Sequence, residues 1–110
     1  MSNTLEINSS TKFSEVMDYI DANYNFTPSK FKNGTIVNEE NQNNGSCKVF
    51  AFAKIKGYTK EQTLLCFGEH YQDVLKTPEQ DSHQNIRNFM EYGWEGIEIS
   101  DNVLKELTNN

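Results

Sequence analysis

The segment Gly45–Lys48 (GSCK) holds the residues whose types and spacing come nearest to a reactive site. A cysteine in the first turn of a helix lies near the positive end of the helix dipole, and the Lys48 ammonium adds a second positive charge, so both favour the nucleophilic thiolate of Cys47. A nucleophilic cysteine also needs a base, and His83 is a better candidate than His70 because it would lie early in a helix. The alternative is that Cys47 is simply a small apolar residue of a buried helix.

Arg87, the only arginine of the chain, follows His83 by four residues, so the two side chains would share one helix face. Its guanidinium could bind a carboxylate or a phosphate of a partner through two parallel hydrogen bonds. The alternative is an intramolecular bridge to an acidic residue such as Asp18, Asp21 or Asp81.

Together these features predict a polar cleft between the helix start at 45–48 and the helix face that carries His83 and Arg87. A binding protein would use this cleft with an unreactive cysteine. A cysteine-dependent or acid/base enzyme would need the Cys47 sulfur beside a histidine nitrogen, and its candidate catalytic residues are Cys47 and His83. The residues assigned to the candidate polar cleft are Asn38, Ser46, Cys47, Lys48, His83, Asn85 and Arg87.

Other kinds of site are not indicated by the sequence. The histidines and cysteines lack the spacing of a zinc site, and no glycine-rich phosphate loop is present, so we expect neither a metal nor a cofactor. The formal net charge of -6 argues against binding to nucleic acid or to a membrane surface, because both depend on clustered Lys and Arg. The expected partner is a protein or a small molecule, and the oligomeric state is left open between a monomer and a weak dimer.

The elements that must position these residues begin with a helix. Phe13 to Ile20 carries apolar residues at i, i+3, i+4 and i+7, with Thr11 as a reasonable N-cap and Tyr24 continuing the stripe. Pro28 lies beyond the end of this helix because the residue before a proline avoids helical backbone. Asn33-Gly34 between two β-capable runs predicts a hairpin with a type I′ turn.

A second helix is predicted over Ser46–Lys56, although its apolar residues also alternate as in a strand. Ser46 as N-cap, Gly57 as a stop and several alanines favour the helix. Thr59–Gln62 is a capping box that opens a third helix, which Gly68 interrupts before a further turn.

Thr77–Gln80 repeats the helix start signal, although residues 81–82 could cap instead. The helix that follows should end near Gly93. Residues 97–99 then alternate as in a short strand, and residues 103–107 allow a terminal helix.

The whole pattern predicts a single α+β domain of about four helices packed with a short β-hairpin and a late short strand. Residues 1–11 are expected to be a flexible N-terminus and residues 12–107 the domain. Cys47 and Cys66 are expected to be free thiols because they lie far apart without a C-x-x-C spacing, although one disulfide is formally possible. No signal peptide is visible at the N-terminus.

Four strings of the sequence, in this order and spacing, resemble the HopJ family of bacterial type III effector-like proteins. They are IDANYNFTPSKFKNG, NGSCKVFAFAKIKG, TLLCFGEHYQDVLKTPE and HQNIRNFMEYGWEGI, and the resemblance covers about residues 13 to 100. It implies an effector-like protein that binds a partner, and it supplies no catalytic residues. It also implies a protein of the bacterial cytoplasm that a type III system could export. A cytoplasmic housekeeping protein without a host target is the alternative.

Overall fold

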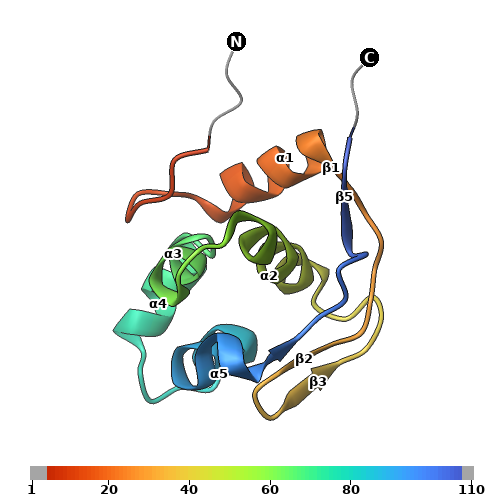
Figure 1. Ribbon diagram of the computed structural model, residues 1–110. Helices are drawn as coiled ribbons and strands as arrows, with labels where there is room; N and C mark the ends of the chain where they lie inside the picture. The colour runs from red at the N-terminus through yellow and green to blue at the C-terminus, as the bar shows by residue number, and fades with distance from the viewer. Residues whose placement is uncertain (1–4, 108–110) are drawn as a thin grey trace.

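The helix with the most buried residues, α2 (Asn44–Lys56), lies at the centre of the molecule (Figure 1). This computed structural model describes residues 5–107. Phe50 and Phe52 of α2 are fully buried and lie in two aromatic groups. The ring of Phe50 packs against those of Phe31, Phe67, Phe89 and Trp94, and the ring of Phe52 packs against those of Tyr19, Tyr24 and Tyr58. Because the five consecutive residues Val49–Ala53 in the middle of α2 are all buried, its apolar residues show no single helical stripe in the sequence.

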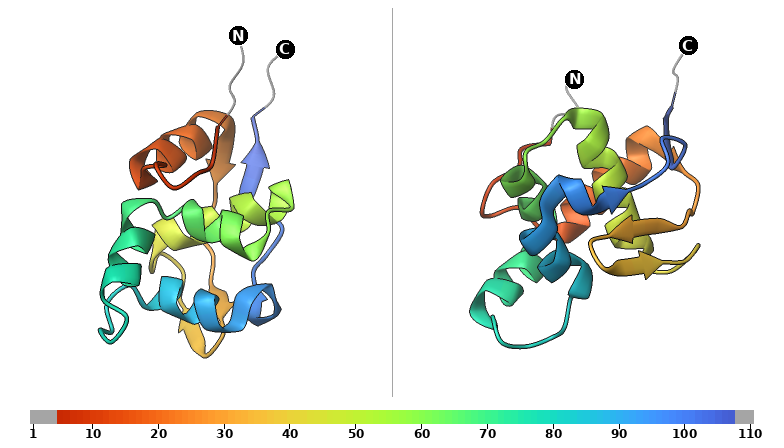
Figure 2. Two further views of the ribbon diagram at one scale, coloured as in Figure 1. Left: turned by 90° about the vertical axis from the view of Figure 1, so that its left-hand side faces the viewer. Right: turned by 60° about the horizontal axis from the view of Figure 1, so that its bottom comes forward.

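The other elements surround α2, with α1 crossing one side, α3 and α4 on another, and α5 on the side opposite α1 (Figures 1 and 2). Mixed helices and antiparallel sheets confirm the predicted α+β class. The structure describes five α-helices where about four were predicted, because α3 and α4 are separate helices with Gly68 between them. The bounds are α1 (Phe13–Asn23), β1 (Tyr24–Phe26), β2 (Phe31–Asn33), β3 (Ile36–Asn38), α3 (Lys60–Leu65), α4 (Glu69–Lys76), α5 (Gln84–Tyr92), the 3-10 helix η1 (Gly93–Gly96), β4 (Ile97–Glu98) and β5 (Leu104–Glu106).

The predicted hairpin is present as β2 and β3, and β4 pairs on the other side of β2 to give the order β3-β2-β4. Its turn differs from the prediction. Asn33 pairs with Ile36, so the two loop residues are Gly34 and Thr35. Gly34 has a φ of 61°, whereas Thr35 has no positive φ, which excludes a type I′ turn. Asn33 stays in the strand and its buried side chain points to α5.

The C-terminal segment is a strand, which corrects the predicted terminal helix. β5 pairs antiparallel with β1, with Phe26 opposite Leu104. The Thr27 N–H also donates to the Val103 carbonyl at 2.8 Å. β1 needs a partner for its backbone groups, and this tertiary pairing outweighs the weak helical pattern of residues 103–107.

Three predicted helix caps are replaced by other residues. Lys12 holds the N-cap position of α1 in place of Thr11, whose hydroxyl accepts the Asn8 N–H at 2.8 Å and so closes a turn before the helix. Asn43 replaces Ser46 at the start of α2, and His83 holds the N-cap position of α5. The remaining cap predictions are confirmed: the Thr59–Gln62 capping box opens α3, Gly57 ends α2 in left-handed backbone, and Gly93 ends α5.

The start signal at Thr77 has a different use. The Thr77 hydroxyl donates to the Asp73 carbonyl at 2.9 Å, and so it terminates α4. A six-residue loop then leads to His83, which takes left-handed backbone (φ 55°, ψ 51°) before α5 begins.

The predicted flexibility of residues 1–11 stays a prediction, and residues 1–4 lie outside the described range. Leu5 and Ile7 pack against the core, and Thr11 is buried. Cys47 and Cys66 are free and buried, which confirms the expected pair of thiols.

Candidate functional site

A cavity of about 480 Å³ lies where the first turns of α2 and α5 meet. Ser46 comes from α2, His83 precedes α5, and His70 comes from the first turn of α4. Phe13 and Phe67 give the cavity an apolar wall. The full lining consists of Phe13, Asn43, Gly45, Ser46, Phe67, His70, His83, Gln84, Asn85 and Ile86.

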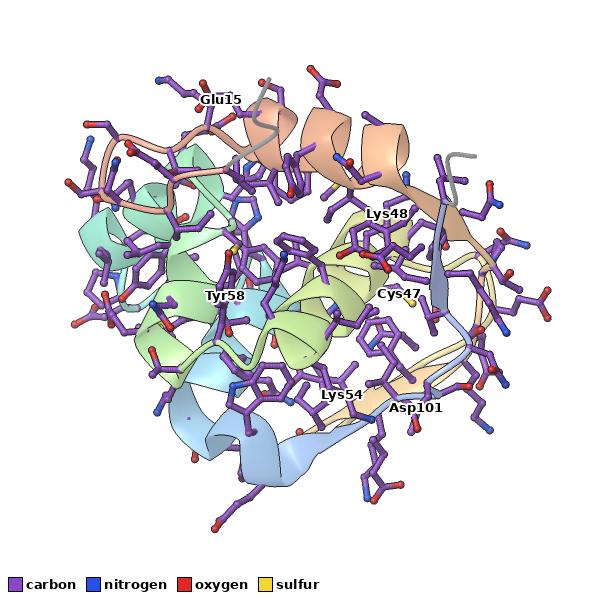
Figure 3. The ribbon with its side chains drawn as sticks, turned by 45° about the horizontal axis from the view of Figure 1, so that its top comes forward. Glu15, Cys47, Lys48, Lys54, Tyr58 and Asp101 are labelled. Atoms are coloured by element: carbon purple, nitrogen blue, oxygen red, sulfur yellow. The ribbon has the colours of Figure 1, made fainter. Side chains whose placement is uncertain are left out.

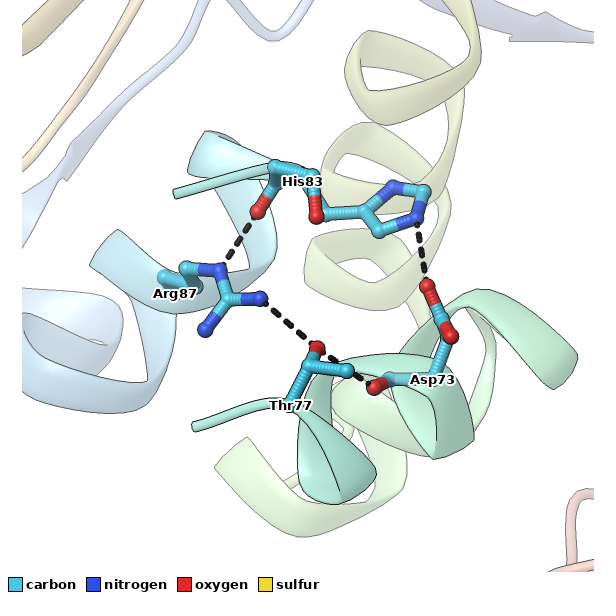
Figure 4. A network of polar contacts seen from close by, with 5 residues as sticks. Asp73, Thr77, His83 and Arg87 are labelled. Carbon is cyan, nitrogen blue, oxygen red and sulfur yellow. Dashed lines mark hydrogen bonds and ion pairs between the residues drawn. The ribbon is translucent and has the colours of Figure 1, made fainter. Parts of the chain in front are cut away.

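His70 and His83 face each other with their ring centroids 5.1 Å apart. The ring of His70 also meets the Phe13 ring edge-on, at 4.9 Å between centroids. His83 Nε2 lies 3.4 Å from the Asp73 carboxylate (Figure 4). This distance is that of an ion pair, and the contact is ionic only when the imidazole is protonated.

Gly68 and Glu69 place α4, and hence His70, beside the start of α1. The Glu69 carboxylate accepts the Phe13 N–H at 2.9 Å, a hydrogen bond that holds the pKa of this carboxyl below its ordinary value. Gly68 has a φ of 58°, and a Cβ there would collide with the Phe13 backbone. A side chain at this position would push α4 away from α1.

Four asparagines fix the starts of α2 and α5 relative to the hairpin. The side chains of Asn38 and Asn85 form a reciprocal amide pair, both hydrogen bonds measuring 3.1 Å. Asn33 Nδ2 donates to the Asn85 carbonyl at 2.8 Å and to its Oδ1 at 3.0 Å, and Asn43 Nδ2 donates to Asn38 Oδ1 at 2.7 Å. The buried amides are thus paired with one another, although Asn33 Oδ1 has no partner among the described residues.

Of the residues assigned to the cleft from the sequence, Ser46, His83 and Asn85 line the cavity. Asn38 lies behind its wall, fully buried and hydrogen-bonded to Asn85. The other three point elsewhere.

Cys47 lies on the side of α2 that faces the chain between β1 and β2. Its side chain is buried, and Sγ lies 3.7 Å from the Ser29 carbonyl oxygen. Burial raises the pKa of the thiol, contrary to the expected effect of the helix dipole. Cys47 does not line the cavity with His83, and this geometry disfavours a thiolate nucleophile.

Lys48 lies between α1 and α2 (Figure 3). Its Nζ pairs with Asp21 of α1, 2.8 Å from Oδ1, and its ammonium lies over the Phe26 ring. Its charge is therefore taken up at the α1–α2 contact and does not reach the cavity.

Arg87 forms hydrogen bonds with the loop between α4 and α5 (Figure 4). Its Nε donates to the Ser82 carbonyl, and its Nη2 donates to the Thr77 hydroxyl at 3.1 Å. The partners are intramolecular, as in the alternative weighed from the sequence, but they are a carbonyl and a hydroxyl where acidic side chains were expected.

Sequence reasoning undervalued His70 and missed Phe13, Asn43 and Gln84. A usable signal exists for His70: Gly68 stops α3, so His70 falls in the first turn of the next helix, the same position that made His83 a candidate. No sequence pattern brings Phe13 to this place, because it depends on the contact between α1 and α4.

Residues 5–107 contain no group of three or more His, Cys, Asp or Glu side chains that could hold a metal ion. Within the same residues, no helix is long and apolar enough to cross a membrane.

Comparison with known proteins gives a family for this fold and site. The family described as HopJ type III effector protein matches residues 1–104. The crystal structure of VPA0580, a protein of unknown function, is similar with 49% sequence identity and a TM-score of 0.88, over 90% of this chain and 83% of that chain. No curated protein matches the sequence. The chain belongs to the HopJ family, because that family matches residues 1–104 and a crystal structure with 49% sequence identity shares the fold.

Proposed function

We propose that this chain is a type III effector-like protein that acts by binding a partner in the cavity between the starts of α2 and α5. The observation that supports this most is the meeting of two helix starts and two facing histidines at one cavity of about 480 Å³. Ligand pockets usually measure about 300–1,000 Å³ and combine an apolar wall with a few polar groups. The partner is a small molecule or a side chain of a protein. Export by a type III system rests on the family description.

An acid/base enzyme that uses the same cavity is the second candidate. The Asp73–His83 pair favours it, because a carboxylate that orients an imidazole is the arrangement of many general bases. A cysteine-dependent enzyme has less support, since the buried Cys47 thiol faces Ser29.

A fragment screen by two-dimensional ¹H–¹⁵N NMR tests where the protein binds. Small fragments should shift the amide signals of residues that line the cavity, such as Gly45, Ser46 and Asn85. Ser46→Trp should abolish these shifts because the indole fills the cavity, while the rest of the spectrum shows that the fold is kept.

Ser14→Trp is the matched control, because Ser14 is an exposed serine in the first turn of α1. It should bind fragments as the wild type does. Fragments that collect in the groove between α4 and α5 at Leu75 and Met90, with none in the cavity, would contradict the proposal.

A further inference from the structure

The start of α2 presents backbone donors to the cavity without acceptors for them. The first intrahelical hydrogen bond of α2 runs from the Cys47 N–H to the Asn43 carbonyl, at 3.0 Å. The N–H groups of Gly45 and Ser46, two residues that line the cavity, have no protein acceptor within residues 5–107. In an α-helix these N–H groups point along the axis towards its start.

The start of α5 repeats this arrangement. Its first intrahelical bond runs from the Ile86 N–H to the His83 carbonyl, at 3.0 Å. Gln84 and Asn85 also line the cavity, and their N–H groups likewise have no acceptor in the described part of the chain. Four backbone donors from two different helices thus belong to residues of one cavity.

The acceptor oxygens of side chains on the cavity lining are all uncharged. The side-chain oxygen of Asn85 already accepts hydrogen bonds from Asn33 and Asn38. No carboxylate stands among the lining residues, although the chain has 16 Asp and Glu. The side-chain oxygens left on the lining are the neutral ones of Asn43, Ser46 and Gln84, so an anionic group that enters the cavity meets backbone donors and no lining carboxylate.

The two histidines add donors that depend on pH. Imidazoles change charge between about pH 5 and 8, and two imidazolium rings in contact repel each other unless an anion lies between them. Asp73 faces His83 from α4. Glu69 of the same helix bonds to the Phe13 N–H, and Lys12, before α1, lies near Glu69. The ring nitrogens of His70 have no hydrogen-bond or ionic partner among residues 5–107.

We propose that the cavity binds the oxyanion group of a small organic ligand, between the two imidazoles and the starts of α2 and α5. The inference rests on the proposed function and names the chemical class of the ligand. Phosphate and carboxylate share the required chemistry, several acceptor oxygens with negative charge. Phe13, Phe67 and Ile86 would cover an apolar body attached to that group.

Four probes of similar shape separate charge from hydrophobicity in an NMR titration: phenyl phosphate, phenylacetate, benzylamine and benzyl alcohol. Phenyl phosphate, phenylacetate or both should shift the amide signals of Gly45, Ser46, Gln84 and Asn85, and the relative affinity of these two decides between phosphate and carboxylate. Benzylamine should leave these signals unchanged. Binding of benzylamine equal to that of both anions would overturn the proposal.

Sulfate keeps its charge over the pH range in which imidazole titrates. Any change of its affinity with pH therefore reports a change in the protonation of the protein. Its affinity should be at least about fivefold higher near pH 6 than near pH 8, because protonated histidines give charge-assisted hydrogen bonds. Equal affinity at both values would remove the histidines from the site.

Variants complete the test. His70→Ala combined with His83→Ala should weaken sulfate binding about tenfold near pH 6 and abolish its pH dependence, since a pair of charge-assisted hydrogen bonds is lost. Lys76→Ala removes an exposed cation at the far end of α4 and should change nothing. If the double variant fails to fold, Ser46→Trp decides, and unchanged sulfate binding in a folded variant overturns the proposal.

The two proposals can fail separately. Neutral fragments that bind the cavity while no anion does would sink the oxyanion inference and leave the binding site in place. If no probe and no fragment reaches the cavity, both proposals fall.

Discussion

Neighbouring residues of α2 have opposite surroundings, and this decides their chemistry. Ser46 lines the cavity, whereas the next side chain, Cys47, turns into the core towards Ser29. The sequence predicted a cysteine beside His83, but in the structure the side chain that faces His83 is that of His70. The imidazoles are thus the titratable groups at the cavity.

Neither cysteine should react while the protein is folded. Burial raises the pKa of Cys47, and it raises the pKa of Cys66 to about 12, so neither forms thiolate near neutral pH. Iodoacetamide at neutral pH should add no mass to the native protein, and two adducts should form in urea. A rapid single adduct on native Cys47, located by peptide mapping, would restore the cysteine-dependent enzyme.

At the scale of elements, the cavity depends on two tethers. The asparagine network joins the hairpin to the starts of α2 and α5, and the Glu69–Phe13 hydrogen bond joins α4 to α1. Asn43 and His83 take left-handed backbone, with φ of 56° and 55°, which is uncommon outside glycine, although asparagine and histidine adopt it more often than other side chains. Such strain is held by the surrounding structure and often occurs at functional sites.

Asn38→Ala should lower the free energy of unfolding by about 2–3 kcal/mol, because the buried amide of Asn85 and the amide of Asn43 lose a partner. Asn25→Ala, at an exposed position of β1, should change it by less than about 0.5 kcal/mol. Urea unfolding curves of the two variants measure the difference. Equal stability of both would mean that the network contributes nothing.

Glu69→Gln should destabilise the protein at neutral pH but not in acid. The pKa of Glu69 is lowered by the Phe13 N–H, so its charged form stabilises the fold above the ordinary pKa of 4.5, and this contribution is lost as pH falls through the lower folded value. Unfolding of wild type and variant should therefore differ near pH 7 and converge once the pH has fallen below the lowered pKa of Glu69. A difference that persists in acid would assign the effect to packing of the side chain.

Signals that act within a few residues were readable from the sequence. The apolar stripe of α1, the capping box before α3 and the glycine stops after α2 and α5 all depend on neighbours in the chain. Distant contacts decided the rest. The pairing of β5 with β1 and the hydrogen bonds of Asn85 to the hairpin could not be derived from local patterns.

The cleft was predicted in part for the same reason. A helix start can be read from local residues, so the two starts at Ser46 and His83 were proposed as one site. The direction of each side chain depends on packing, and packing turns Cys47, Lys48 and Arg87 away from the cavity. It also brings Phe13 from α1 to the cavity wall.

At the scale of the whole molecule, an acidic protein keeps its carboxylates off the lining of one cavity. The net charge of -6 repels anions at a distance, but salt screens this repulsion beyond about 8–10 Å. The hydrogen-bond donors at the cavity can then determine which ligands bind there. The burial of α2 in the core fixes the position of its first turn, which lines the cavity together with the first turn of α5.

Amide hydrogen exchange at the two helix starts tests most directly whether a ligand binds between them. In the free protein, the N–H groups of Gly45, Ser46, Gln84 and Asn85 should exchange quickly, while those of Cys47 and Ile86, which are hydrogen-bonded, exchange slowly. Adding the tightest-binding fragment should slow exchange at the first four. Exchange at these amides that stays fast while the bound fragment protects another surface would contradict the account.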